Sequence, residues 1–393
     1  MTLAAPPLNP PVRLLMGPGP SEIHPAVLRA LSANTVGHLD PYYLQLMNDM
    51  QQMLRAVFRT SNPLTMAISG TGSAGMESTV VNLVEPGDSM LVCVNGVFGE
   101  RMVDVATRAG AEVTRVDRPW GDIFSPADLK AALAKAKPKV VGIVMAETST
   151  GALQPIPEIA ELVHEAGALL LVDAVTSLGG VPVNVDDWQI DCIYSGTQKC
   201  LSCPPGLSPV SFSPRAMDVV MSRKTKVRSW YLDVSMLAKY WGSERVYHHT
   251  APINMTYALY EALRIVLDEG LDNCFARHAL NHRALKAGLS AIGIKYAARE
   301  GHQLPMLNAV LVPEGVDDTW VRSNLLNRFG IEIGGGLGTF KGKAWRVGLM
   351  GHAARSRNVL LFLGALEQLL AEQRYKFDAG ASIAAANQVY AAG

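Results

Sequence analysis

The feature that most restricts the fold of this chain is an alternation of short apolar runs with amphipathic helices between residues 64 and 214. Most of the runs are apolar at every position, which is typical of strands that are buried on both faces of a sheet. The predicted strands are residues 65–69, 90–94, 112–116, 140–146, 169–172, 192–194 and 209–212, and the predicted helices between them are residues 74–84, 99–109, 126–136 and 157–166. This order predicts an α/β fold with a mostly parallel seven-stranded sheet.

The rest of the chain has a different pattern. Long helices are predicted at 257–268 and 276–291, and mixed strands and helices follow at 306–312, 319–328, 331–333, 344–347 and 355–372. Strands and helices grouped in this way predict a smaller α+β domain. We expect an extended N-terminal arm (1–25), a large domain (26–268), a small C-terminal domain (269–374) and an Ala-rich tail with a weak helical pattern (375–393).

The composition favours a small-molecule ligand. Lysine plus arginine equals aspartate plus glutamate, at 35 each, and a neutral chain without a basic run argues against nucleic acid or an anionic membrane. We expect no signal peptide and no apolar run of about 18 residues that could span a membrane. Five scattered cysteines indicate reduced thiols and a cytoplasmic protein. The pair Cys200 and Cys203 has no second pair or histidine near it, so we expect no metal site.

A glycine-rich turn, Gly70-x-Gly72-x-x-Gly75, lies between a predicted strand and a predicted helix. This is the spacing of a dinucleotide-binding fingerprint. An NAD-linked dehydrogenase would also need an acidic residue at the end of the next strand, where this chain has Asn95. The turn could be a purely structural one made of small residues. As a helix N-terminus, it could instead bind a phosphate group of another ligand.

Three further strand ends carry reactive or polar side chains. Thr148 and Ser149 follow the fourth predicted strand, Asp173 follows the fifth, and Lys199 lies in a loop of small residues after the sixth. Each could be a turn former, a helix cap or a surface residue when it is considered alone. In parallel sheets, however, ligands bind beyond the carboxyl ends of the strands. A phosphate turn, a buried acid and a lysine together suit pyridoxal phosphate, which needs a lysine for its Schiff base and an acid facing its pyridinium nitrogen.

The sequence also closely resembles the alanine:glyoxylate aminotransferases, which belong to the class V group of fold-type I pyridoxal-phosphate enzymes. The resemblance runs from about residue 10 to about residue 372, and its motifs occur in the same order. They are Met16-Gly-Pro-Gly-Pro-Ser21, Asn62-Pro-Leu-Thr65, Ser69-Gly-Thr-Gly72, Glu147-Thr-Ser-Thr-Gly151, Leu171-Val-Asp-Ala-Val-Thr-Ser-Leu-Gly-Gly180, Ser195-Gly-Thr-Gln-Lys199, Tyr247-His-His-Thr250 and Trp345-Arg-Val-Gly-Leu-Met-Gly351.

The resemblance implies a role for individual residues. Lys199 matches the Schiff-base lysine, Asp173 the partner of the pyridinium nitrogen, and Arg346 the arginine that binds the substrate carboxylate. Around the ring and the phosphate of the cofactor it implies Thr148, Val175 and Phe98, and then Thr71, Gly72, Ser73 and Gln198. Tyr247 and Thr250 match residues that reach the phosphate of the neighbouring subunit, so we expect a homodimer with shared active sites.

The implied reaction is ping-pong transamination, in which L-alanine donates its amino group and glyoxylate accepts it to give pyruvate and glycine. L-Serine could be a second donor, and a serine:glyoxylate or an (S)-ureidoglycine:glyoxylate aminotransferase is the alternative. Ureidoglycine enzymes resemble this chain at Asn9-Pro-Pro and in the small-residue tail, but they typically carry Gln in place of His38 and Asn near Trp230. A cysteine desulfurase would need a reactive cysteine on a loop well beyond the lysine, whereas the last cysteine here is Cys274, in a helical stretch.

Overall fold

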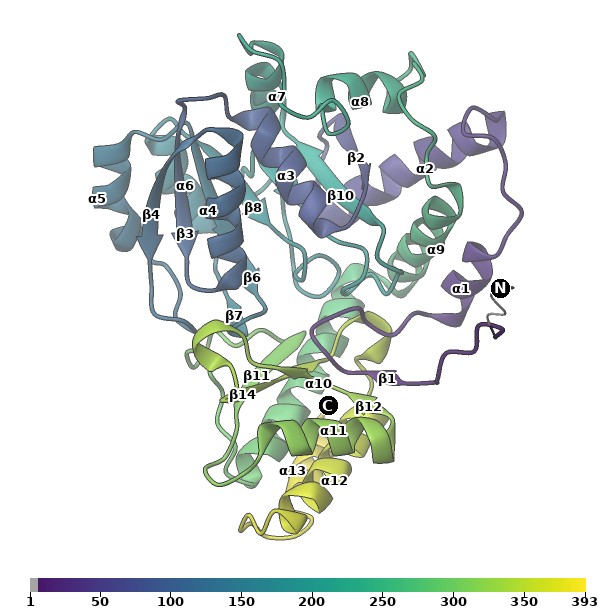
Figure 1. Cartoon of the computed structure of the whole chain (residues 1–393), viewed down its shortest axis with the longest axis vertical. Coiled ribbons are helices and arrows are strands. Elements are labelled where there is room, and N and C mark those ends of the chain that lie inside the picture. The colour runs from purple at the N-terminus through teal and green to yellow at the C-terminus, as the bar shows by residue number, and fades with distance from the viewer. Residues whose placement is uncertain (1–5) are drawn as a thin grey trace, which may run out of the picture.

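The computed structural model describes residues 6–393, and a seven-stranded sheet with the order β2-β10-β9-β8-β5-β3-β4 forms its centre (Figure 1). The strands from β9 to β4 pair in parallel, while β10 is antiparallel to both of its neighbours. The strands are β2 (Leu64–Ser69), β3 (Ser89–Val94), β4 (Glu112–Asp117), β5 (Val140–Val144), β8 (Leu169–Asp173), β9 (Cys192–Tyr194) and β10 (Leu207–Phe212). The predicted α/β class and mostly parallel sheet are confirmed.

Helices cover both faces of this sheet. Every residue of β5, β8 and β10 is buried, and successive side chains of a strand point to opposite faces. Four helices that follow strands pack against the sheet, namely α3 (Gly72–Leu83), α4 (Val97–Ala109), α5 (Pro126–Ala136) and α6 (Pro157–Glu165). The other helices of this part are α1 (Pro25–Leu31), α2 (Pro41–Phe58), α7 (Pro214–Met221), α8 (Val234–Trp241) and α9 (Ile253–Glu269).

A second, smaller group of elements lies below the large sheet in Figure 1. Its antiparallel sheet has the order β11-β14-β13, and its buried side chains form a hydrophobic cluster of their own. Its elements are α10 (Leu271–Ala291), β11 (Leu307–Leu311), α11 (Asp318–Phe329), β12 (Ile331–Glu332), β13 (Gly334–Gly335), β14 (Ala344–Gly348), α12 (Ser356–Glu372) and α13 (Ala381–Ala392). Helix α10 contributes Cys274 to the hydrophobic cluster of the large sheet and Leu285 to the cluster of the smaller group. The predicted domain boundaries therefore stay a prediction.

The described part of the N-terminal arm is bound to the smaller group. Strand β1 (Leu14–Leu15) pairs in parallel with β12, and Met16 is fully buried in the second hydrophobic cluster. Residues 1–5 of the predicted arm lie outside the described residues. The arm therefore passes beside the smaller group before it reaches α1, as the purple segment of Figure 1 shows.

One predicted strand is shorter in the structure, and the weak helical pattern of the tail forms a helix. The predicted strand 140–146 ends at Val144, and the chain then forms a separate hairpin of β6 (Ala146–Glu147) and β7 (Ala152–Leu153). The weak helical pattern of the tail becomes α13, whose first turn is held by the carboxylate of Glu367: it accepts hydrogen bonds from the backbone N–H groups of Gly380 and Ser382. Among residues 6–393, no helix is both long and apolar enough to cross a membrane.

Candidate active site

A cavity of about 210 Å³ lies at the carboxyl edge of the large sheet. The ends of β2, β8 and β9 meet there because these strands run in the same direction. Most of the predicted site residues line it, and three lining residues were not predicted: Met76, Arg101 and Tyr194. The full set is Thr71, Gly72, Ser73, Met76, Phe98, Arg101, Asp173, Val175, Tyr194, Gln198 and Lys199.

Lys199 is buried in the wall of this cavity, with 8% of its surface exposed. Its ammonium group contacts the carbonyl oxygen of Pro18, and its own carbonyl accepts a hydrogen bond of 2.6 Å from the hydroxyl of Ser21. Gly19 passes so close that a Cβ atom would lie 2.6 Å from Nζ. Burial lowers the pKa of Lys199 to about 8. With this pKa about a tenth of the amine is uncharged at pH 7, and the uncharged form is the one that acts as a nucleophile and proton carrier.

Asp173 ends β8 and is held by two donors. The hydroxyl of Tyr194 donates to Oδ2 at 2.7 Å, and the backbone N–H of Val175 donates to Oδ1 at 2.8 Å. Burial raises the pKa of Asp173, while these hydrogen bonds and the charge of Lys199 oppose the rise. The sequence analysis missed Tyr194, although it stands directly opposite Asp173 on the neighbouring strand β9. The two hydrogen bonds keep the carboxylate of Asp173 oriented at the edge of the cavity.

The N-terminus of α3 forms the wall that was predicted to bind a phosphate. Thr71 is its N-cap and makes no side-chain capping bond, so the first N–H groups of the helix remain free for an anion. A Cβ atom on Gly72 would come 3.2 Å from Val175, so a larger residue here would press against the side chain of Val175. Among the described residues, the buried Oε1 of Gln198 has no hydrogen-bond partner. Free N–H donors and small residues fit the phosphate group of pyridoxal phosphate, and the amide of Gln198 could bind it through its NH₂ group but not through the acceptor Oε1.

Glu147 is a fully buried carboxylate that organises one side of the cavity. Oε2 accepts from the backbone N–H groups of Phe98 and Gly99 at 3.1 and 3.4 Å, and Oε1 accepts from the N–H and hydroxyl of Ser149 at 3.1 and 2.6 Å. Burial raises its pKa to about 7. Glu147 thus fixes the start of α4 and the position of Phe98, a role that its motif alone did not reveal. Its neighbour Thr148 is buried but does not line the cavity.

Arg346 lies on β14, in the smaller group, and is mostly buried with 8% of its surface exposed. Its Nε donates to the carbonyl of Gly335 at 2.8 Å, and within the described residues its two terminal nitrogens stay free for a ligand. Burial lowers its pKa to about 10, and the negative charge of Glu147 opposes this. Arg346 does not line the cavity itself, but its positive charge helps to lower the pKa of Lys199. The two groups are therefore within electrostatic reach of each other.

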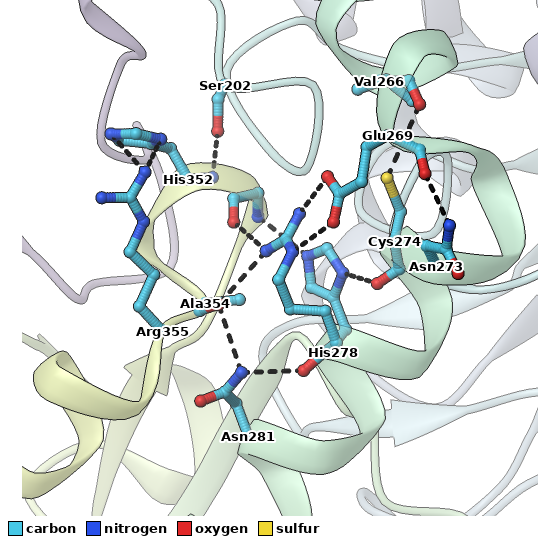
Figure 2. Close-up of polar contacts among 12 residues, drawn as sticks. Ser202, Val266, Glu269, Asn273, Cys274, His278, Asn281, His352, Ala354 and Arg355 are labelled. Atoms are coloured by element: carbon cyan, nitrogen blue, oxygen red, sulfur yellow. Dashed lines mark hydrogen bonds and ion pairs between the residues drawn. The ribbon is translucent and has the colours of Figure 1, made fainter.

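The turn that follows β14 is tied to the loop that carries Lys199. The hydroxyl of Ser202 accepts a hydrogen bond of 2.7 Å from the backbone N–H of His352 (Figure 2). A Cβ atom on Gly351 would come 2.6 Å from the carbonyl oxygen of Cys200 and closer still to Ser202. This contact between the two parts of the chain holds the strand of Arg346 against the active-site loop.

Helix α10 also contacts the turn that follows β14. Arg277 donates to the carbonyl of Gly351 at 2.7 Å and is itself paired with Glu269. The Nε2 atom of His278 accepts a hydrogen bond of 2.9 Å from the backbone N–H of Gly351. Its Nδ1 therefore carries the proton and donates to the backbone carbonyl oxygen of Cys274 at 2.6 Å. Burial lowers the pKa of His278 to about 4, which keeps the ring neutral and this pattern intact at neutral pH.

Tyr247 and Thr250 lie elsewhere in this chain. Both are exposed, Tyr247 with 55% of its surface, and neither lines the cavity. The ring of Tyr247 packs against His38 with centres 5.1 Å apart, and Trp230 stacks on His248 at 4.4 Å. The predicted role of Tyr247 and Thr250 in a neighbouring subunit stays a prediction.

The structure argues against both rival enzyme classes. Strands β2 and β3 are separated by four other strands, so the glycine-rich turn does not belong to a βαβ unit with adjacent strands. Asn95 at the end of β3 donates to the backbone of Asp122. Cys274 is buried with 1% exposure, unlike a reactive cysteine on a loop. Residues 6–393 contain no group of three or more side chains able to hold a metal ion.

Comparisons with known proteins agree with this geometry. A model of the aminotransferase class-V family matches residues 16–350. The structure of an alanine–glyoxylate aminotransferase from Nostoc sp. is 53% identical and covers 94% of this chain and 98% of its own, with a TM-score of 0.92. A ureidoglycine–glyoxylate aminotransferase from Bacillus subtilis is 41% identical with a TM-score of 0.96, covering 98% and 100%. The alanine–glyoxylate aminotransferase of Mus musculus is 42% identical over 93% of this chain and 89% of its own. The chain therefore belongs to the class-V aminotransferases, which depend on pyridoxal phosphate.

Proposed function

We propose that this chain transfers the amino group of L-alanine to glyoxylate in two half-reactions, which yield pyruvate and glycine. The observation that carries the proposal is the convergence of Lys199, Asp173 and the N-terminus of α3 on one cavity. No single residue of this set requires a transaminase. Together they provide the three contacts that pyridoxal phosphate needs, at the sheet edge where ligands bind.

Each residue has a distinct task in this proposal. When bound, pyridoxal phosphate supplies a carbonyl carbon that carries the amino group and a ring that accepts electrons. Lys199 would hold the cofactor through Nζ and, once an amino donor has freed it, its neutral amine would take the proton from the α-carbon of the donor and pass it on to the cofactor. Asp173 keeps the proton on the ring nitrogen, and Arg346 binds the substrate carboxylate with its planar fork.

Several features favour alanine as the donor. The Nostoc enzyme, named for alanine, shares more residues with this chain than the Bacillus enzyme, named for ureidoglycine. This chain also carries His38 and Trp230 where ureidoglycine enzymes typically carry Gln and Asn. The Bacillus enzyme nevertheless matches the whole fold, so ureidoglycine is the second candidate donor. Serine is the third, because its small side chain resembles that of alanine.

We further propose a cytoplasmic homodimer. Large apolar side chains are exposed on one chain, among them Trp230 at 60%, Tyr42 at 65% and Leu28 at 49%. Trp230 and the exposed Tyr231 lie together around His248, and exposed apolar residues that gather in one patch are typical of surfaces that bind another protein. An active site shared between two subunits would give Tyr247 and Thr250 their phosphate contact. All five cysteines are buried and free, which supports a reducing compartment.

The test is a set of separate half-reactions followed by visible absorption. The purified protein, saturated with pyridoxal phosphate, is mixed with L-alanine, L-serine or (S)-ureidoglycine, and each mixture then receives glyoxylate. We expect alanine to bleach the band of the lysine-bound cofactor and glyoxylate to restore it. Bleaching by ureidoglycine alone would replace the proposed donor. The absence of any band would contradict the roles of Lys199 and Asp173.

A further inference from the structure

The charges around the cavity leave the predicted phosphate site without an assigned cation. Among the described residues that line the cavity, the charged ones are Lys199, Asp173 and Arg101. If the proposed function is correct, Lys199 is used in the covalent bond to the cofactor and Asp173 faces its ring nitrogen. The predicted phosphate contacts from the same chain are neutral N–H, hydroxyl and amide groups. A phosphate carries one to two negative charges near neutral pH, which leaves Arg101 as the balancing cation.

The position of Arg101 brings it to this end of the cavity. It lies one helical turn after Phe98 on α4, so both side chains project from the same side of the helix. Its guanidinium carbon is 4.9 Å from the centre of the Phe98 ring. One of its terminal nitrogens donates to the hydroxyl of Ser73 at 3.3 Å. Ser73 belongs to the first turn of α3, the helix whose N-terminus faces the phosphate site.

The positive charge of Arg101 also affects the pKa values of three other groups that line the cavity. It acts to lower the pKa of Asp173, of Tyr194 and of Lys199, although burial is the largest influence on each of them. Arg101 itself is an exposed residue. Its hydrogen bond to Ser73 occupies one terminal nitrogen, and the rest of its fork has room to bind an anion.

We propose that Arg101 is a binding residue for the phosphate group of pyridoxal phosphate and supplies its permanent positive charge. A guanidinium stays charged at any pH at which the enzyme folds, and its fork matches the oxygens of a phosphate. This inference rests on the proposed function, because it requires the cofactor to lie in this cavity. The competing explanation is that Arg101 only covers the ring of Phe98 as a surface side chain. That role would not depend on the phosphate.

The test compares pyridoxal phosphate with pyridoxal, which lacks the phosphate. Equilibrium dissociation constants of both ligands are measured by quenching of protein fluorescence, with apo forms of the wild type, Arg101→Gln, Arg101→Lys and Arg108→Gln. We expect Arg101→Gln to weaken the binding of pyridoxal phosphate about ten-fold or more, as the loss of a charge-assisted bond does. Pyridoxal binding should be unchanged. Arg101→Lys should keep most of the affinity because it keeps the charge.

Arg108 is the matched control, since it lies on the same helix in an exposed ion pair with Asp104. Its exchange should change neither dissociation constant. Equal weakening of both ligands by Arg101→Gln would overturn the inference and leave Arg101 as a support for Phe98. Unchanged affinity would overturn it too. If Arg101→Gln does not fold, the same comparison is made with Arg101→Lys at low and high salt, where the phosphate-dependent part should shrink as salt screens it. A wild type that binds neither ligand would contradict the proposed function itself.

Discussion

At the carboxyl edge of the sheet, Lys199 and Asp173 are buried and hydrogen-bonded within one chain, whereas Tyr247 and Thr250 lie exposed on its surface. The first region is built from strand ends, whose positions follow from the pairing of the sheet. The second lies on a loop before α9, and within the described residues neither Tyr247 nor Thr250 lines the cavity. The difference teaches that the proposed covalent chemistry uses residues of one chain, while the proposed phosphate contacts from the surface region need a second chain.

Among these substitutions, Lys199→Ala should have the largest effect on the region at the carboxyl edge of the sheet. We expect the turnover of alanine and glyoxylate to fall by about a thousand-fold or more, because the nucleophile and the proton carrier are lost together. The rate is measured from pyruvate formation. The melting temperature serves as the folding control. Retained turnover in a folded variant would remove Lys199 from the chemistry.

A weaker loss should follow Arg346→Gln. The variant retains a polar side chain but loses the charged fork, so kcat/KM for alanine should fall about ten- to hundred-fold. We expect the plateau rate of cofactor attachment at high pH, where the Lys199 amine is neutral, to stay at the wild-type value; at lower pH the loss of the Arg346 charge raises the pKa of Lys199 and slows attachment. If both quantities fell in parallel, Arg346 would act on the cofactor and not on the substrate carboxylate.

The pH dependence of cofactor attachment should report the environment of Lys199. Its pKa in the folded protein is about 8, below its ordinary value, so the reactive neutral amine decreases below that pH. We expect the attachment rate of pyridoxal phosphate to the apoprotein to rise about ten-fold per pH unit and then level off above about pH 8. Stopped-flow absorption measures this rate. A rate that continues to rise up to pH 10 would mean that the amine is not desolvated.

The second region can be tested by mixing two inactive variants. In a dimer of one Lys199→Ala chain and one Tyr247→Ala chain, one site would carry both changes and the other would carry neither. Random reassociation should therefore restore about a quarter of the wild-type activity. Activity that does not rise on mixing would place Tyr247 and Lys199 in the same site of one chain, or remove Tyr247 from the site.

We expect the smallest effect from Glu147→Gln, which changes a buried carboxylate beside the cavity. Both carboxylate oxygens accept hydrogen bonds, so an amide would set its NH₂ group against two donors. We expect the free energy of unfolding to fall by about 1–3 kcal/mol, as measured by urea denaturation. The exposed Glu161 on α6, beyond the first turn of the helix, provides the control, and Glu161→Gln should change stability by less than about 0.5 kcal/mol. An equally stable Glu147→Gln variant would contradict the proposed organising role.

The sequence predicted the elements that depend on local pattern. The strands and helices of the large sheet follow from their apolar patterns. Asp173 could be found because it follows an apolar run directly, and Lys199 because it lies in the small-residue loop after the next run. Arg346 needed the resemblance to a family, since an arginine at a strand end has no local signature. Val144 was not recognised as the end of its strand, because the hairpin of β6 and β7 depends on hydrogen bonds made by Glu147.

By itself, then, the sequence determined the α/β class and the edge of the sheet at which chemistry occurs, because strand ends can be read from the chain in order. Only the tertiary structure decided which distant side chains surround those ends. Tyr194 stands opposite Asp173 through strand register, Arg101 reaches Ser73 from another helix, and Met16 joins the core of the smaller group. These contacts join residues far apart in the chain, so no local pattern encodes them, and packing of the whole fold sets their distances.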